Sequence, residues 1–263
     1  MVRPTAERVV DRYVVSQVYP PTLHRFPDDT SGRFQILREF LLRWHGLDTG
    51  TVGRTAPRVD EAEASVGKVL PLAVREWIVL LDDLHRIDGW KHVLRDCWGL
   101  KKVPNCPAFS LLSGGEGDRH WGPLFRDLAR EDPPTSEFVP DYERDEQRFK
   151  RVRQVAPRVS TWATEFILSY LHLSPSLQVE RTASRPTLDR MCRQSADPVV
   201  VLQIGDTELI EFTGGLMHAE PDGPGLVRLH CHAPYRGVST SDYFGAAREF
   251  ERRLDAMLGV TSP

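Results

Sequence analysis

The stretch that most constrains the fold runs from Val59 to Leu84 and reads VDEAEASVGKVLPLAVREWIVLLDDL. Asp60 and Glu63 have the spacing of a capping box, which predicts the start of a short helix. Gly67 is expected to end this helix, because glycine enters the left-handed C-terminal conformation without strain. Pro71 suits the first turn of a second helix. The apolar residues of that helix recur at the spacing of a core-packing face: Val74, Trp77, Ile78 and Leu81.

Amphipathic patterns also flank a middle part that has the composition of strands and turns. Further helices are expected at residues 5–17, 36–44 and 160–171, the last with Ser160 as its N-cap, after Pro186, and at the C-terminus before Gly259. Strands are expected at residues 109–112, 120–124, 148–152, 199–204, 207–212, 216–220 and 226–232. These elements predict an α+β fold, in which helices cover a mostly antiparallel sheet and also lie at both termini.

Two later stretches follow the first in a recognisable order. They are CPAFSLLSGGEGDRHWGPLFRDLAREDPPTSEFV at Cys106–Val139 and RVSTWATEFILSYLHL at Arg158–Leu173. Together the three stretches resemble the SUKH superfamily, the Smi/Knr-type domains of fungal cell-wall regulators and of bacterial immunity proteins that neutralise polymorphic toxins. The first resembles the opening helices of the family, the second its hairpin with a "G…WG" return strand and a following "DPP", and the third its "S…FLL" helix.

This resemblance implies one SUKH-like domain over residues 1–263. Its core spans about residues 33–173, and residues 174–263 add β-hairpins and a helix that complete the same domain. The implied function is that of a non-enzymatic protein-interaction module, an immunity protein that binds and occludes a cognate toxin. A regulatory adaptor without a toxin partner is a variant within the same class.

Charge and cysteine usage narrow the class of protein further. The 34 basic and 37 acidic residues give a formal charge of −3, whereas a dedicated nucleic-acid binder needs a basic excess. No window is long and apolar enough for a membrane span, and the N-terminus lacks the apolar run of a signal peptide. The four cysteines have no CxxC spacing, which predicts reduced and mostly buried thiols. We therefore expect a cytoplasmic protein with a protein partner and no cofactor.

The familiar catalytic motifs are missing, and one metal site competes with the binding hypothesis. No GxSxG, Walker, HExxH or GxGxxG motif occurs in its required context. On the last strand, Val227, Leu229 and Cys231 face one way, and Arg228, His230 and His232 face the other. Together with His218 from the preceding strand, these two imidazoles would supply the three ligands of a zinc-dependent hydrolase. The plainer interpretation is that they are half-exposed sheet residues.

Two tryptophans are candidates for contact with a partner. Trp90 and Trp98 lie in an irregular segment, so we expect them to be more exposed than the tryptophans of the amphipathic helices. Aromatic residues are enriched at the centres of protein interfaces. These two residues are therefore predicted partner-binding residues.

Two acidic clusters are the other candidates. Glu116 and Asp118 lie at a predicted hairpin tip, and Asp141, Glu143 and Asp145 lie in a predicted loop. Many toxins neutralised by proteins that resemble this family are nucleases with basic clefts, which an acidic loop can fill as a nucleic-acid mimic. The plainer interpretation is a solvated surface, and Arg144 and Arg148 interrupt the second cluster.

Overall fold

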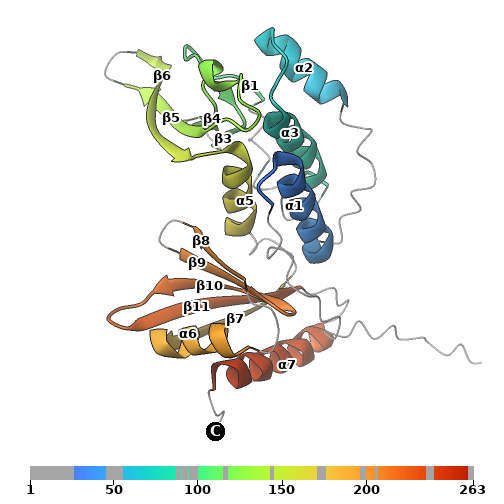
Figure 1. Cartoon of the computed structure of the whole chain (residues 1–263), viewed down its shortest axis with the longest axis vertical. Helices are drawn as coiled ribbons and strands as arrows, with labels where there is room; N and C mark the ends of the chain where they lie inside the picture. The colour runs from blue at the N-terminus through green and yellow to red at the C-terminus, as the bar shows by residue number, and fades with distance from the viewer. Residues whose placement is uncertain are drawn as a thin grey trace, which may run out of the picture. The chain divides into compact units, whose positions relative to one another are not determined.

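A computed structural model describes residues 27–45, 56–86, 90, 94, 100–114, 118–142, 145–170, 176–195, 200–204, 207–234 and 240–259. These residues form six α-helices and three antiparallel sheets, which confirms the predicted α+β class (Figure 1). The predicted helix at residues 5–17 lies outside the described part of the chain.

The contacts within the chain define two compact units that divide at Pro175. The first, Thr22–Pro175, is called the helical unit here, and the second, described from Ser176 onward, the meander unit. The sequence pattern predicted a single domain over residues 1–263, in which residues 174–263 add the last β-hairpins and a helix. The meander unit has a five-stranded sheet and an apolar core formed by its own residues, and the single domain stays a prediction. Among the described residues, the five strands of this sheet pair only with one another.

Three helices of the helical unit pack on one another (Figure 1). The unit contains α1 (Thr30–His45), α2 (Ala56–Val66), α3 (Leu72–Leu84) and α5 (Val159–Ser169). The predicted core stripe of α3 is fully buried, and α3 contacts both α1 and α5. Trp77 lies at this junction, where its ring makes T-shaped contacts with the rings of Trp162 and Phe166.

The link between α2 and α3 differs in detail from the prediction. Helix α2 begins at Ala56, so Asp60 and Glu63 lie within the helix and do not form a capping box at its start. Glu63 instead accepts a hydrogen bond at 2.9 Å from the amide of Leu70, just before α3. Gly67 has φ of 68°, and it ends α2 as predicted.

The strands of the helical unit form a two-stranded and a four-stranded sheet. They are β1 (Lys101–Lys102), β2 (Phe109–Ser110), β3 (Leu112–Ser113), β4 (His120–Gly122), β5 (Thr135–Asp141) and β6 (Asp145–Ala156). Strands β3 and β4 form the predicted hairpin. A Cβ atom on Gly122 would lie 1.8 Å from the carbonyl oxygen of Phe109, so the "WG" of the motif marks a close approach of two backbones.

Strand β5 was not predicted, because its sequence TSEFVPD is mostly polar. Its partner β6 is rich in basic residues, which explains how these polar side chains become buried. The Nε atom of Arg151 donates to the Ser136 hydroxyl at 2.9 Å, and the Nε atom of Arg153 donates to Glu137 at 3.0 Å. Cross-strand pairing with β6 therefore compensates for the missing apolar residues of β5.

The meander unit matches the predicted strands closely. It contains β7 (Ser176–Ser184), α6 (Arg185–Gln194), β8 (Val200–Ile204), β9 (Thr207–Phe212), β10 (Gly215–Pro221), β11 (Leu226–Pro234) and α7 (Thr240–Leu258). The sheet order is β7-β11-β10-β9-β8, in which the last four strands form consecutive hairpins. Gly259 follows α7 with φ of 67°, as predicted for its C-terminus.

Helices α6 and α7 cover one face of this sheet (Figure 1). Val227, Leu229 and Cys231 are buried in the core on that face, as their alternation predicted. Strand β7 was not predicted, because Arg181 interrupts its apolar alternation. The guanidinium of Arg181 donates to Asp255 of α7 at 2.8 Å, so the helix neutralises the charge.

Candidate functional site

Residues Glu131, Asp132 and Pro133, called the capping segment here, hold the starts of two helices. The carbonyl oxygen of Glu131 accepts from the Ala73 amide of α3 at 3.1 Å. The carbonyl oxygen of Pro133 accepts from the Val159 amide of α5 at 2.8 Å. The first amides of a helix have no partner within it, so this segment satisfies one at each helix.

The carboxylate of Asp132 caps α5 more directly. It accepts from the Ser160 amide at 3.1 Å and also from the Ser160 hydroxyl. Ser160 was predicted as the N-cap, but α5 already begins at Val159, and Arg158 at the N-cap position makes no side-chain cap. The capping group is therefore Asp132, 28 residues earlier in the chain.

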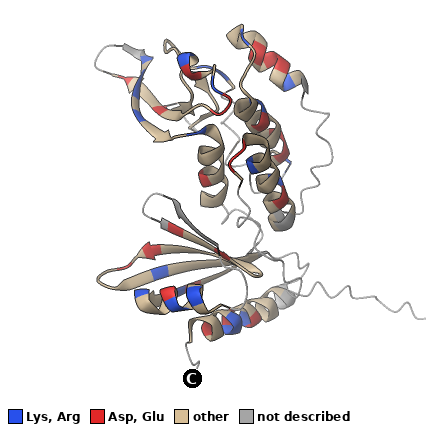
Figure 2. Ribbon diagram, viewed as in Figure 1, with Lys and Arg blue, Asp and Glu red and all other residues tan. Residues whose placement is uncertain are grey.

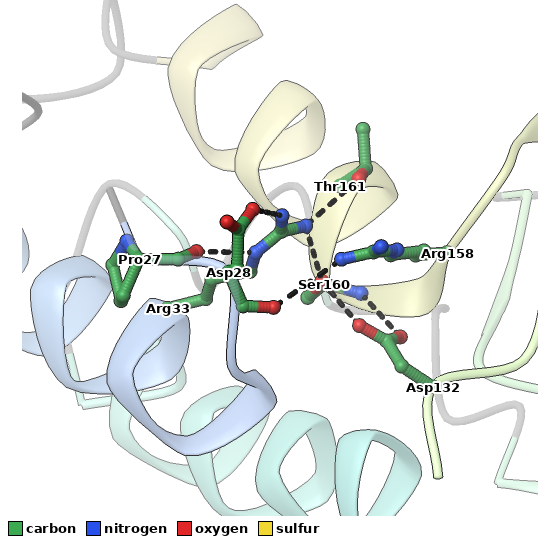
Figure 3. Close-up of polar contacts among 7 residues, drawn as sticks. All are labelled: Pro27, Asp28, Arg33, Asp132, Arg158, Ser160 and Thr161. Carbon is green, nitrogen blue, oxygen red and sulfur yellow. Dashed lines mark hydrogen bonds and ion pairs between the residues drawn. The ribbon is translucent and has the colours of Figure 1, made fainter. Parts of the chain in front are cut away.

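Arg33 of α1 joins the same network (Figure 3). Its guanidinium donates to the Ser160 hydroxyl at 3.2 Å and to the Pro27 carbonyl at 2.7 Å. Arg158 donates to the Asp28 carbonyl at 3.3 Å. The residues before and within α1 are thereby tied to the N-terminus of α5 (Figure 3).

All three stretches of the family resemblance meet through such contacts. The capping segment belongs to the second stretch, and it binds α3 of the first and α5 of the third. In addition, the indole Nε1 of Trp77 donates to the Leu111 carbonyl at 3.0 Å. Hydrogen bonds therefore join the three stretches, which are separate in sequence, into one connected framework.

His120 of β4 is buried, and its ring contacts residues of β2 and β6. The Nδ1 atom of His120 lies 3.0 Å from the Ser110 hydroxyl, and its ring meets Phe149 edge-on. Burial lowers the pKa of His120 to about 4, with a further lowering by Lys101 and an opposing effect of Asp118. The imidazole is therefore neutral near pH 7 and fits its largely apolar surroundings.

The predicted acidic clusters are placed differently from each other. Asp118 is exposed two residues before β4, and its role in partner binding stays a prediction. Asp141 is not a loop residue, because it ends β5, where it is buried and lies 3.1 Å from the Lys150 ammonium. Asp145 begins β6 opposite Asp141, while Glu116 and Glu143 lie outside the described residues.

The predicted exposure of Trp90 is wrong. Its side chain is fully buried, with its ring centre 5.8 Å from that of Phe166 and 5.9 Å from that of Tyr170. Phe166 lies in α5 and Tyr170 directly follows it, so the Trp90 ring packs against the C-terminal end of this helix. Trp98 lies outside the described residues.

The three histidines of the metal hypothesis share one face of the meander sheet. His218 lies opposite His230 in the ladder, and the ring centres of His218 and His232 are 5.6 Å apart. The Nδ1 atom of His230 lies 3.2 Å from a carboxylate oxygen of Glu180. Over the described ranges, no group of three or more His, Cys, Asp or Glu residues is placed to hold a metal ion.

A surface hollow of about 510 Å³ was missed from the sequence. It is lined by Lys102, Asn105, Cys106, Pro107, Phe125 and Arg148. These residues come from the β1–β2 turn, the 3-10 helix η3 (Phe125–Asp127) and β6. The sequence signals were the adjacent Lys101 and Lys102 and the basic Arg148 in a predicted strand. They do not indicate that the β1–β2 turn, η3 and β6 meet in space.

Comparisons with protein-family models, curated proteins and solved structures yield no match. Within the described part of the chain, no helix combines the length and apolar character that crossing a membrane requires.

Proposed function

We propose that this chain is a SUKH-type protein-interaction module. It acts in the cytoplasm as an immunity protein, and it neutralises a cognate toxin by binding it, without bond chemistry of its own. The observation that carries this proposal is the capping segment, whose hydrogen bonds join the three stretches of the resemblance. Motifs that belong to one family domain have to be neighbours in space, and these are.

The β5–β6 hairpin is the surface that we assign to the partner. Tyr142 is 70% exposed at its end, and Val152 is 54% exposed on β6. Residues 147–158 contain five Arg or Lys and no Asp or Glu, and Figure 2 shows the basic residues along β6. Tyrosine and arginine are enriched at protein interfaces, where they combine apolar contact with hydrogen bonding. Asp118, which is exposed on the β3–β4 hairpin, stays a predicted contact residue.

Co-expression with the product of the neighbouring gene, which the proposal identifies as the toxin, tests the proposal. We expect growth to be restored and the two proteins to purify together. Tyr142→Ala is expected to weaken the complex about tenfold or more, as is typical of an aromatic contact residue at an interface. The matched control is Phe244→Ala, which removes an exposed aromatic side chain from α7 of the meander unit and is expected to leave binding unchanged.

The outcomes separate the members of this class. Binding without rescue of growth would favour the regulatory adaptor over the immunity protein. Neither binding nor rescue would show that the toxin hypothesis is wrong. Equal losses in Tyr142→Ala and Phe244→Ala would contradict the assignment of the β5–β6 hairpin as the contact surface.

A further inference from the structure

The outer edge of β6 presents backbone groups that no neighbouring strand uses. Strand β6 lies at the border of the four-stranded sheet, whose order is β3-β4-β5-β6 (Figure 1). Among the described residues, β6 pairs only with β5, and the backbone of residues 149–154 makes no other hydrogen bond. In a border strand, alternate residues direct their N–H and C=O groups away from the sheet. This edge is therefore a template for one more strand.

The same segment is exposed on both faces of the sheet. All five residues from Lys150 to Gln154 are exposed, although successive side chains of a strand face opposite sides. An incoming strand would therefore reach the edge and the side chains on either side of it. The opposite border strand, β3, has only two residues, which is short for strand pairing. Strand addition to this sheet therefore fits β6.

The geometry and charge of this edge disfavour a second copy of the chain as the added strand. Arg151 pairs with Phe138 and Arg153 pairs with Glu137, so Val152 is the extra residue of a β-bulge. Bulges and charged side chains are two ways in which edge strands avoid pairing with identical edges. Two β6 edges in contact would also bring their basic side chains together, and like charges on adjacent strands are destabilising.

The positive charge of β6 favours an acidic strand instead. Residues 147–158 contain five Arg or Lys and no Asp or Glu. Lys150 and Arg153 keep 48% and 70% of their side chains exposed within their ion pairs with β5. Arg151 uses its Nε atom for the Ser136 hydroxyl, and a guanidinium carries four further N–H donors. An extended segment with Asp or Glu at alternate positions is therefore complementary to this edge.

We propose that an extended acidic segment of the protein partner pairs with residues 149–154 and adds a fifth strand to the four-stranded sheet. Backbone hydrogen bonds supply the affinity, and the carboxylates of the segment pair with Lys150, Arg151 and Arg153. The inference rests on the proposed function for the identity of the partner. It deepens that function by naming the mode of contact at the β5–β6 hairpin.

A fluorescein-labelled peptide of sequence TEVETEVE tests this edge on the full-length chain without any toxin. We expect fluorescence anisotropy to report binding, and hydrogen exchange to slow about tenfold at the outward amides of residues 149–154. Two further peptides carry N-methyl groups on all odd or on all even positions. Because alternate residues direct their amides to opposite sides, only one of these two peptides should lose binding, by tenfold or more.

Matched variants test the charge of the edge. Arg151→Glu should weaken peptide binding tenfold or more, whereas Arg151→Lys should largely retain it. Arg248→Glu, at an exposed position on α7, makes the same change in net charge and should have less than a twofold effect. Hydrogen exchange of free Arg151→Glu shows whether its β6 stays paired with β5. Equal losses in Arg151→Glu and Arg248→Glu would contradict an acidic strand at this edge.

Three further results would overturn the proposal. The first is an absence of peptide binding, and the second is equal binding of the two methylated peptides, which would indicate charge attraction without strand pairing. The third is slow exchange of all amides of residues 149–154 in the free chain, which would show that a second copy or another segment of this chain already covers the edge. Because the titration needs no toxin, a failed rescue of growth would leave its result unaffected. A failed titration would likewise leave the test of Tyr142→Ala unaffected.

Discussion

The two units of this protein hold their helices in different ways. In the helical unit, Asp132 caps the N-terminus of α5, and the Ala73 amide of α3 donates a hydrogen bond to the Glu131 carbonyl oxygen. In the meander unit, the side chain of Ser184 accepts from the Thr187 amide, only three residues away, at the start of α6. A distant carboxylate thus caps a helix of the helical unit, whereas a side chain three residues away caps a helix of the meander unit.

This difference predicts which substitutions lower the stability of each unit. Elements that are capped locally depend mainly on apolar burial for their stability. A buried polar network between distant residues also loses stability when one hydrogen-bond partner is removed, because the other partner is left unsatisfied. The chain offers a separate probe for each unit. All six tryptophans lie between residues 44 and 162, in the helical unit. Cys231 is fully buried in the meander core, so its alkylation reports opening of that unit.

The largest effect is expected for Trp77→Ala. The substitution empties a fully buried site, removes the hydrogen bond to Leu111 and removes two aromatic contacts. We expect a loss of about 3–5 kcal/mol in the free energy of unfolding of the helical unit. Urea unfolding followed by the fluorescence of the remaining tryptophans measures it, while Cys231 alkylation should keep its midpoint.

Trp77→Phe is the matched control for this prediction. It retains most of the buried ring and removes the indole N–H, so a smaller loss of about 1–2 kcal/mol is expected. A parallel shift of the Cys231 midpoint in Trp77→Ala would show that the two units unfold as one. The distinction between them would then have no thermodynamic meaning.

The reciprocal change is Leu254→Ala in α7. Leu254 is fully buried in the meander core, so the truncation leaves a cavity and should cost about 2–5 kcal/mol. We expect Cys231 to become reactive at lower urea concentration, while the tryptophan transition stays in place. Exposed Phe244→Ala on the same helix is the control, with a change below about 0.5 kcal/mol. A shift of the tryptophan transition in Leu254→Ala would contradict independent cores.

Local patterns predicted much of both units, because their information lies within a few residues. The stripe of α3, the left-handed Gly67 and the alternation around Leu229 all follow from short-range spacing. The β8–β9 hairpin is likewise specified by two apolar runs and a short turn. Element type was therefore accessible from the sequence wherever one element determines its own burial.

The contacts that failed to be predicted join residues far apart in the chain. Arg181 and Asp255 are 74 residues apart, and each alone indicates a surface position. Trp90 is buried because α5 supplies aromatic partners, which no spacing near residue 90 reveals. The hollow likewise needs three segments to meet around Lys102. Charge and aromatic residues alone do not specify whether they face solvent, a partner strand or a ligand.

A pH titration sharpens the comparison for the helical unit. Burial lowers the pKa of His120 to about 4, below its ordinary value of about 6.5 in the unfolded chain. Between these values the unfolded state binds more protons, so the free energy of unfolding falls as pH falls from 6.5 to 4, by up to about 3 kcal/mol. Urea midpoints followed by tryptophan fluorescence measure this dependence. In His120→Gln, the free energy of unfolding should fall by up to about 3 kcal/mol less over this pH range. A pH dependence equal to that of the unsubstituted chain would contradict the prediction.

The smallest effect compares two aspartates that accept hydrogen bonds in opposite settings. Asp132→Ala removes the distant cap of α5 and one partner of Ser160, so the helical unit should lose about 1–2 kcal/mol. Asp189→Ala removes an exposed pair with Arg185 in α6, at the local i, i+4 spacing, and should cost less than about 0.5 kcal/mol. Asp132→Asn, which keeps one acceptor oxygen for the Ser160 amide, should recover part of the loss. Urea unfolding of the three variants measures these differences with the two separate probes. Equal losses for Asp132→Ala and Asp189→Ala would mean that the distant cap contributes no more than a surface pair, and the contrast between the units would then rest on apolar packing alone.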